Sequence, residues 1–196
     1  RLRQQRARVG FDGDRHDLGT QRVELTVRDG QRYAGRVRAW VLDGDASTDE
    51  LSAALSDRGH PMWGRVTDYS EESNLVTNLG RERMTLLMVA ESTRTATHIA
   101  LSTTAVTPAL TDTVGTITNR IYTQALTIAQ SYLTFSQRFV AYFTTTSFGS
   151  TGVVTEALLD ASSTAATTNL WADASISVSK STTQSLIVEH IVTATT

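Results

Sequence analysis

Apolar and polar residues alternate along much of this chain in short runs that turn-forming residues separate. Residues 22–27 and 32–42 alternate on either side of the turn sequence RDGQ, a pattern typical of a β-hairpin. After a second turn, Ser47 and Glu50 have the spacing of a helix capping box. The predicted helix has an apolar stripe of Leu51, Ala54 and Leu55 and ends near residues 58–59, before Pro61.

The stretch that follows has no clear period. We expect an irregular path over residues 62–79, with Trp63 and Tyr69 packed under a loop, and then a buried strand over residues 85–91. The density of charged residues falls at residues 93–97 and stays low afterwards. We therefore predict two modules: an N-terminal docking module over residues 1–94 and an assembly domain over residues 95–196.

The second part of the chain consists of strand-sized apolar pieces rich in β-branched residues. They occupy residues 98–101, 124–128, 132–142, 153–158, 174–180 and 185–192. Several short strands at this spacing favour an antiparallel β-sandwich. The predicted fold class is mainly β: a small α+β N-terminal module followed by an antiparallel β-sandwich.

The distribution of charged residues along the chain bears on its function. Residues 121–196 carry six formal charges, and most of their polar positions are Ser or Thr. A solvent-facing domain normally carries charges of both signs, so such a stretch suggests that much of its surface meets other protein. Fifteen of the seventeen arginines lie in residues 1–94. They fit either contacts with carboxylates or phosphates, or a compositional bias of the coding sequence.

Several functions lose support from the sequence. The net charge of −2 argues against a dedicated nucleic-acid binder, and no apolar run is long enough to span a bilayer. The chain has no cysteine and its four histidines stand apart, so no metal site built on Cys or His is expected. The sequence GSTG at residues 149–152 lacks the spacing of a nucleophile elbow. Acidic clusters at residues 12–17 and 43–49 are better explained as turns than as cation sites.

One carboxylate needs a partner. Glu156 lies inside the apolar run of residues 153–159, where an ionised group is costly unless it is paired. We predict that Arg120 or backbone amides hold it, and that the pair fixes strand register as a structural ion pair.

The order of several short motifs in the last hundred residues resembles a domain widespread in structural proteins of tailed bacteriophages. That domain has a strand similar to IALGTGTTAP, then DT, an Arg, a strand of the form IxEAGL, a stretch similar to LFAR and two final strands. Here the matching pieces are HIALSTTAVTPA at residues 98–109, Asp112-Thr113, Arg120, TEALL at residues 155–159 and LWA at residues 170–172. This chain departs from the pattern at Ser102, Thr104, Leu158 and Asp173.

The resemblance implies a β-sandwich module of a virion in a tail, collar or fibre position, with no cofactor and no reaction. We therefore expect a non-enzymatic virion subunit, assembled in the host cytoplasm, that contacts copies of itself in a trimer or ring and other virion proteins. Its partners would include neither nucleic acid nor membrane. Candidate interface residues are Tyr122, Tyr132, Tyr142, Phe143, Phe148, Trp171 and His190.

Two other functions stay open at this point. A host-receptor or glycan-binding adhesin at a fibre tip would need exposed aromatic residues near a polar cleft, most plausibly around Phe148 and Trp171. A depolymerising hydrolase would need paired carboxylates in one groove, and Glu156, Asp160 and Asp173 are the acids available in the second module.

Overall fold

The computed structural model describes residues 32–88, 96–104, 107–112, 120–133, 136–147, 152–160 and 170–195. Within these ranges, the side chains of residues 32, 85–88, 120–123, 129–133, 152–153, 155–160 and 195 are not part of the description.

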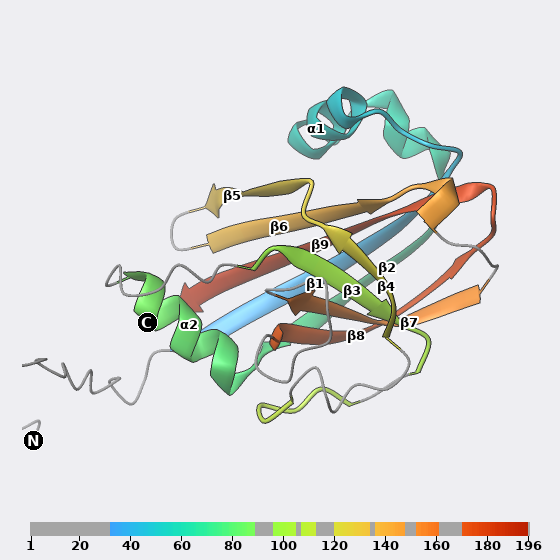
Figure 1. Cartoon of the computed structure of the whole chain (residues 1–196). Helices are drawn as coiled ribbons and strands as arrows, with labels where there is room; N and C mark the ends of the chain where they lie inside the picture. Colours follow the sequence, from blue (N-terminus) through green and yellow to red (C-terminus); the bar gives the residue numbers. More distant parts are fainter. Residues whose placement is uncertain are drawn as a thin grey trace, which may run out of the picture.

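Nine strands among the described residues form one antiparallel sheet (Figure 1). Their order across the sheet is β4-β3-β7-β8-β2-β1-β9-β6-β5. The mainly-β, antiparallel prediction is confirmed. The strands are β1 (Arg32–Asp43), β2 (Val66–Val76), β3 (His98–Ser102), β4 (Arg120–Ala125), β5 (Ile128–Leu133), β6 (Ser136–Phe143), β7 (Gly152–Asp160), β8 (Leu170–Lys180) and β9 (Gln184–Thr195).

The longest pairing in the sheet joins strands from the two ends of the described chain. β1 pairs with β9 over its whole length, from Arg32 opposite Thr195 to Asp43 opposite Gln184, and its other edge pairs with β2. Residues 22–27, the first strand of the predicted hairpin, lie outside the described residues. From Gly35 to Leu42, β1 is paired on both edges. The predicted boundary near residue 94 does not divide the sheet, because β1 and β2 lie between β8 and β9.

The sheet curls where β2 meets β8. These strands pair only at Leu75 and Val76 and then diverge. Side chains of β2 satisfy the β8 amides beyond that point: Ser177 N donates to Ser70 Oγ at 3.3 Å, and Ser179 N donates to Asp68 Oδ2 at 2.7 Å. The opposite ends of the sheet order, β4 and β5, are joined by a two-residue link at residues 126–127, so the two edges meet at that corner.

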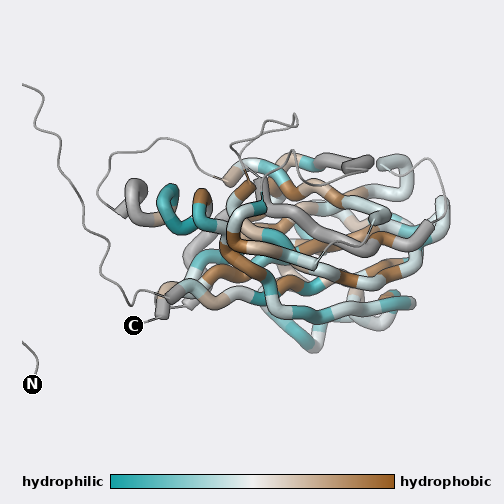
Figure 2. Tube along the Cα trace, turned by 90° about the horizontal axis from the view of Figure 1, so that it is seen from below, coloured by the Kyte–Doolittle hydropathy of each residue, from teal (hydrophilic) through white to brown (hydrophobic). Residues whose placement is uncertain are grey.

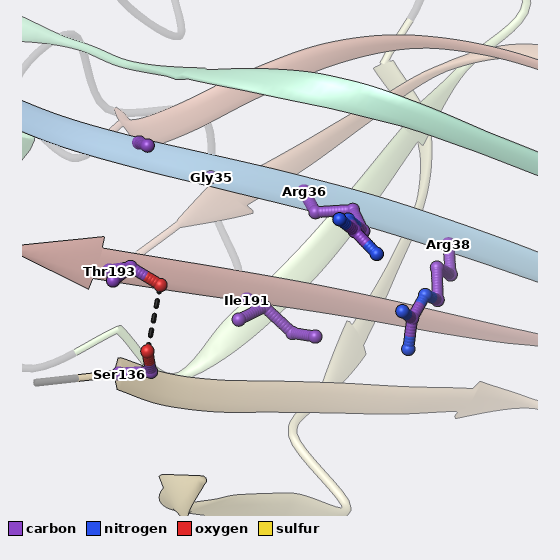
Figure 3. A pocket seen from close by; sticks show the side chains of 7 residues that line it. Gly35, Arg36, Arg38, Ser136, Ile191 and Thr193 are labelled. Carbon is purple, nitrogen blue, oxygen red and sulfur yellow. Dashed lines mark hydrogen bonds between the residues drawn. The ribbon is translucent and has the colours of Figure 1, made fainter. Parts of the chain in front are cut away.

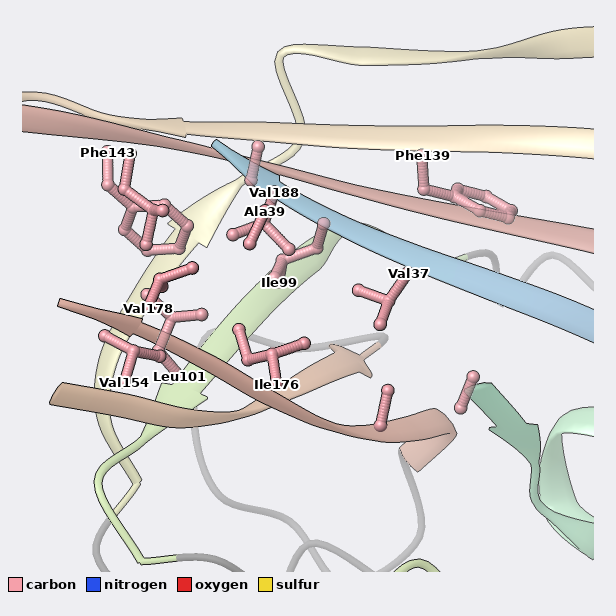
Figure 4. Close-up of a cluster of buried hydrophobic side chains, with 14 of the residues drawn as sticks. Val37, Ala39, Ile99, Leu101, Phe139, Phe143, Val154, Ile176, Val178 and Val188 are labelled. Atoms are coloured by element: carbon pink, nitrogen blue, oxygen red, sulfur yellow. The ribbon is translucent and has the colours of Figure 1, made fainter. Parts of the chain in front are cut away.

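The curl encloses the larger apolar core (Figure 4). Residues of β1, β6 and β9 on one side face residues of β3, β7 and β8 on the other, for example Ala39 and Val188 against Ile99 and Ile176. Figure 2 shows apolar stretches alternating with polar ones along the strands, as expected when one face of each strand is buried. Burial of these side chains supplies the main stabilising term of the fold.

A second, smaller core lies on the outer face of the sheet, where α1 (Thr48–Ser56) and the 3-10 helix η1 (Pro61–Arg65) pack. Glu50 N donates to Ser47 Oγ at 3.1 Å, which confirms the predicted cap. The stripe of Leu51, Ala54 and Leu55 is buried as predicted, although the helix ends at Ser56. A second 3-10 helix, η3 (Thr145–Ser147), follows β6.

Two predicted segments are wrong. Residues 62–79 contain η1 and the eleven-residue strand β2 rather than an irregular path. Residues 85–88 end the helix α2 (Asn78–Met88), whereas a strand was expected there. Thr77 begins this helix, because its Oγ1 accepts a hydrogen bond from Gly80 N at 3.0 Å. Residues 89–91 lie outside the described residues.

Candidate functional site

A cluster of charged residues lies on the outer face of the sheet beside α1. Because side chains alternate along a strand, Arg36 and Arg38 of β1 point away from the larger core while Val37 points into it. The register places Arg38 between Glu71 of β2 and Glu189 of β9. We call Arg36, Arg38, Glu71, Arg138 and Glu189 the charge cluster.

Glu189 is the buried centre of the charge cluster, with 0% of its side chain exposed. Arg138 Nε lies 2.7 Å from Glu189 Oε1, and Arg38 Nη1 donates to Glu189 Oε2 at 3.3 Å. Arg138 Nη1 also donates to the carbonyl of Leu55 at 3.4 Å, which ties β6 to α1. Two guanidinium groups thus compensate one carboxylate that burial would otherwise penalise.

Glu71 extends the charge cluster toward solvent. It is held by Arg36 Nη1 at 2.8 Å and Arg38 Nε at 3.2 Å, and the hydroxyl of Tyr69 donates to its carboxylate. The Tyr69 hydrogen bond, aided by the charges of Arg38 and Arg36, lowers the pKa of Glu71 below its ordinary value. With three arginines and two glutamates, the charge cluster carries a net formal charge of +1.

Aromatic residues border the charge cluster. The guanidinium of Arg58 lies 5.2 Å from the ring centroid of Trp40 and 5.0 Å from that of Trp63, within cation–π range. Tyr69 stacks at a tilt on Trp40 with ring centroids 5.7 Å apart. Tyr69 is 45% exposed, so the prediction that it packs under a loop is wrong.

A pocket of about 330 Å³ opens next to the charge cluster (Figure 3). Strands β1, β6 and β9 build it. It is lined by Ala34, Gly35, Arg36, Arg38, Ser136, Ile191 and Thr193.

Three of the predicted interface residues lie in the interior. Phe143 and Trp171 belong to the larger core, and His190 is fully buried with its Nδ1 3.1 Å from Asn74 Nδ2. Their prediction as interface residues is wrong, because strand alternation turns each of them away from solvent. Burial lowers the pKa of His190 to about 3, so it is neutral at physiological pH.

The remaining predicted interface residues divide into two groups. Tyr142 is half-buried, and its hydroxyl donates to Asp45 Oδ1 at 3.1 Å and accepts from Ala46 N at 2.6 Å, which anchors the turn after β1. The side chains of Tyr122 and Tyr132, and the whole of Phe148, lie outside the described residues.

The backbone of the predicted Arg120–Glu156 pair is described, although its side chains are not. Arg120 of β4 and Glu156 of β7 are both register partners of Ser102, one on each side of β3. The ion pair itself stays a prediction.

The residues named for the alternative functions lie partly outside the description. Asp173 is fully buried, and the side chains of Glu156 and Asp160 lie outside the description. Of the two aromatic residues named for the adhesin hypothesis, Trp171 is buried and Phe148 lies outside the described residues. No group of three or more potential metal ligands occurs among the described residues.

Sequence reasoning missed the residues at the centre of the charge cluster. The rule that singled out Glu156 also applies to Glu189, which lies in the apolar run SLIVEHIV at residues 185–192. The same rule applies to Arg138, beside the apolar residues of β6. The signal was therefore present, but only the pairing of distant strands identifies the partners.

Comparison with models of protein families, with curated proteins and with solved structures found no match. Neither α1 nor α2, nor any other described helix, has the length and apolar character that crossing a membrane requires.

Proposed function

We propose that this protein is a non-enzymatic structural subunit of a tailed-bacteriophage particle, in the tail, neck or fibre, and that it acts through repeated contacts with copies of itself and with other virion proteins. The observation that carries the proposal is the absence of charge from the described exposed side chains of one part of the chain. Among the described side chains of residues 121–196, every one that is exposed or half-buried is uncharged.

None of the six charged residues of this segment is a described exposed side chain. Four of them, Arg138, Asp173, Lys180 and Glu189, are buried, and the side chains of Glu156 and Asp160 lie outside the description. The exposed positions are Ala125, Thr127, Gln137, Thr146, Ser177, Ser179, Thr182 and Thr183.

A surface of small hydroxyl side chains suits contact between subunits. Ser and Thr lose little side-chain entropy on burial, whereas each Lys or Glu at a contact must be desolvated and ordered. Symmetric assemblies repeat the same contact many times, so a modest area per copy can hold a ring or trimer together. The resemblance of residues 98–196 to phage structural modules supports a virion as the setting of such an assembly.

Light scattering on the purified chain, combined with a charge-insertion variant, tests the assembly. We expect an oligomer whose mass persists on dilution, and we expect Ser177→Lys on β8 to lower that mass by placing a charge in the contact. Ser52→Lys is the matched control, because Ser52 is an exposed serine on α1, outside residues 121–196. A monomer at every concentration, or equal effects of the two variants, would contradict the proposal.

The virion setting has a separate test. Mass spectrometry of purified particles of the phage that encodes the chain should detect it at a fixed copy number, and immunogold labelling should place it at one position on the particle. Its absence from purified particles would overturn the virion role while leaving the assembly result unaffected.

A further inference from the structure

We propose that the pocket beside the charge cluster binds a single carboxylate group, supplied either by a small organic acid or by an acidic side chain of another protein chain. This inference does not depend on the proposed function. It rests on the shape of the pocket, its hydrogen-bond donors and its charge.

The shape follows from the register of three strands. Ala34 of β1, Thr193 of β9 and Ser136 of β6 stand opposite one another, and all three are small. The neighbouring row begins with Arg36 opposite Ile191. Rows on one face of a sheet are about 7 Å apart, so small residues beside long ones leave a hollow. The volume of about 330 Å³ is at the lower end of the range of small-molecule sites.

Donors line this hollow on two sides. Arg36 uses Nη1 for Glu71, and Arg38 uses Nε and Nη1 for Glu71 and Glu189. A guanidinium has five N–H groups, and among the described residues no further contact of Arg36 is found, so its remaining donors can serve a ligand. On the other side, Ser136 Oγ and Thr193 Oγ1 lie 2.8 Å apart. Because one hydroxyl donates to the other, one O–H remains for a ligand.

Charge selects the ligand. The +1 charge of the cluster is neutralised by one carboxylate, whereas a phosphate dianion would leave a net negative charge close to Glu71 and Glu189. Arg36 is 53% exposed, so the ligand can reach it from solvent without opening the fold. The planar fork of a guanidinium matches the two oxygens of a carboxylate.

The experiment is an NMR titration of the ¹⁵N-labelled full chain at low ionic strength. The probes are acetate, the peptide acetyl-Gly-Glu-Gly-amide and, as a neutral control, acetyl-Gly-Gln-Gly-amide. We expect saturable shifts at the amides of Ala34, Arg36 and Thr193 with acetate and the Glu peptide, and none with the Gln peptide. Equal affinity for acetate and the Glu peptide would indicate a small acid as the ligand. Tighter binding of the peptide would indicate a side chain of another protein.

Two variants test the pocket in different ways. Ala34→Leu fills the hollow without changing the charge, and Arg36→Gln removes donors without filling it; each should weaken binding about fivefold or more. Arg65→Gln is the matched control, because Arg65 donates to the carbonyl of Asp45 beyond the opposite end of β1. The proposal is overturned by unsaturable shifts, by equal binding of the Gln peptide, or by a loss in Arg65→Gln as large as that in Arg36→Gln.

Discussion

Glu189 illustrates, at the scale of a single residue, how this fold tolerates charge in its interior. It lies within hydrogen-bond or ion-pair distance of Arg38 and Arg138, from two different strands, and has no exposed surface. Removal of a buried charge leaves its partners uncompensated, which is costlier than never having had the pair. Loss of a single member of the charge cluster is therefore expected to destabilise the fold.

We predict that Glu189→Ala lowers the free energy of unfolding by about 3–5 kcal/mol, because two arginines lose a buried partner. Urea denaturation measures the change. Glu72→Ala, at an exposed position on β2, is the control and should change stability by less than about 0.5 kcal/mol. Equal stability of the two variants would mean that the cluster contributes no net stabilisation.

His190 gives a pH prediction. Its folded pKa of about 3 lies below the ordinary value of 6.5, so between these two values the unfolded chain binds a proton that the folded chain does not. Stability therefore falls as pH falls through this window, by about 1.4 kcal/mol per pH unit. Urea denaturation at pH 7 and pH 4.5 should show a smaller loss for His190→Gln than for the wild-type chain. Identical losses would contradict the prediction.

At the scale of secondary-structure elements, features that depend on residues close in sequence could be predicted. Features that depend on distant residues could not. The cap at Ser47 and the stripe of α1 involve residues within one or two turns, so the sequence was sufficient. β2 was missed because Asp68 and Ser70 serve the amides of β8 rather than an apolar core, which hides the period of the strand. The apolar run after Thr85 fits a helix or a strand equally well, and the local pattern does not show that α2 as a whole lies against β8.

The packing of α2 on β8 depends on a glycine. A Cβ at Gly80 would lie 2.1 Å from the carbonyl oxygen of Trp171, a backbone atom that cannot move alone. We predict that Gly80→Ala destabilises the chain by about 1–3 kcal/mol. Gly64→Ala is the control, since a Cβ there would meet nothing within 4 Å. Thermal unfolding of both variants measures the difference, and a neutral Gly80→Ala would show that α2 can shift at no cost.

At the scale of the whole molecule, charge is unevenly distributed along the chain. Among the described residues, the exposed charged side chains belong to residues 36–112, whereas the exposed side chains of residues 121–196 carry no charge. An assembly held by those uncharged side chains should be insensitive to salt, because screening acts only on charges. We predict that the mass from light scattering stays constant between about 50 mM and 500 mM NaCl. Dissociation at the higher salt concentration would point instead to contacts through the arginines.

The pairing of β1 with β9 also has a consequence for the order of events during synthesis. β1 can pair with β2 early, but its other edge can pair only after β9, about 150 residues later in the chain, has been synthesised. Contacts so distant in sequence form slowly, and an open strand edge can pair with the wrong partner in the meantime. A nascent chain thus passes through a stage in which β1, an interior strand of the finished sheet, is an edge strand. A ribosome-bound chaperone, or rapid synthesis of β9, would shorten that exposure.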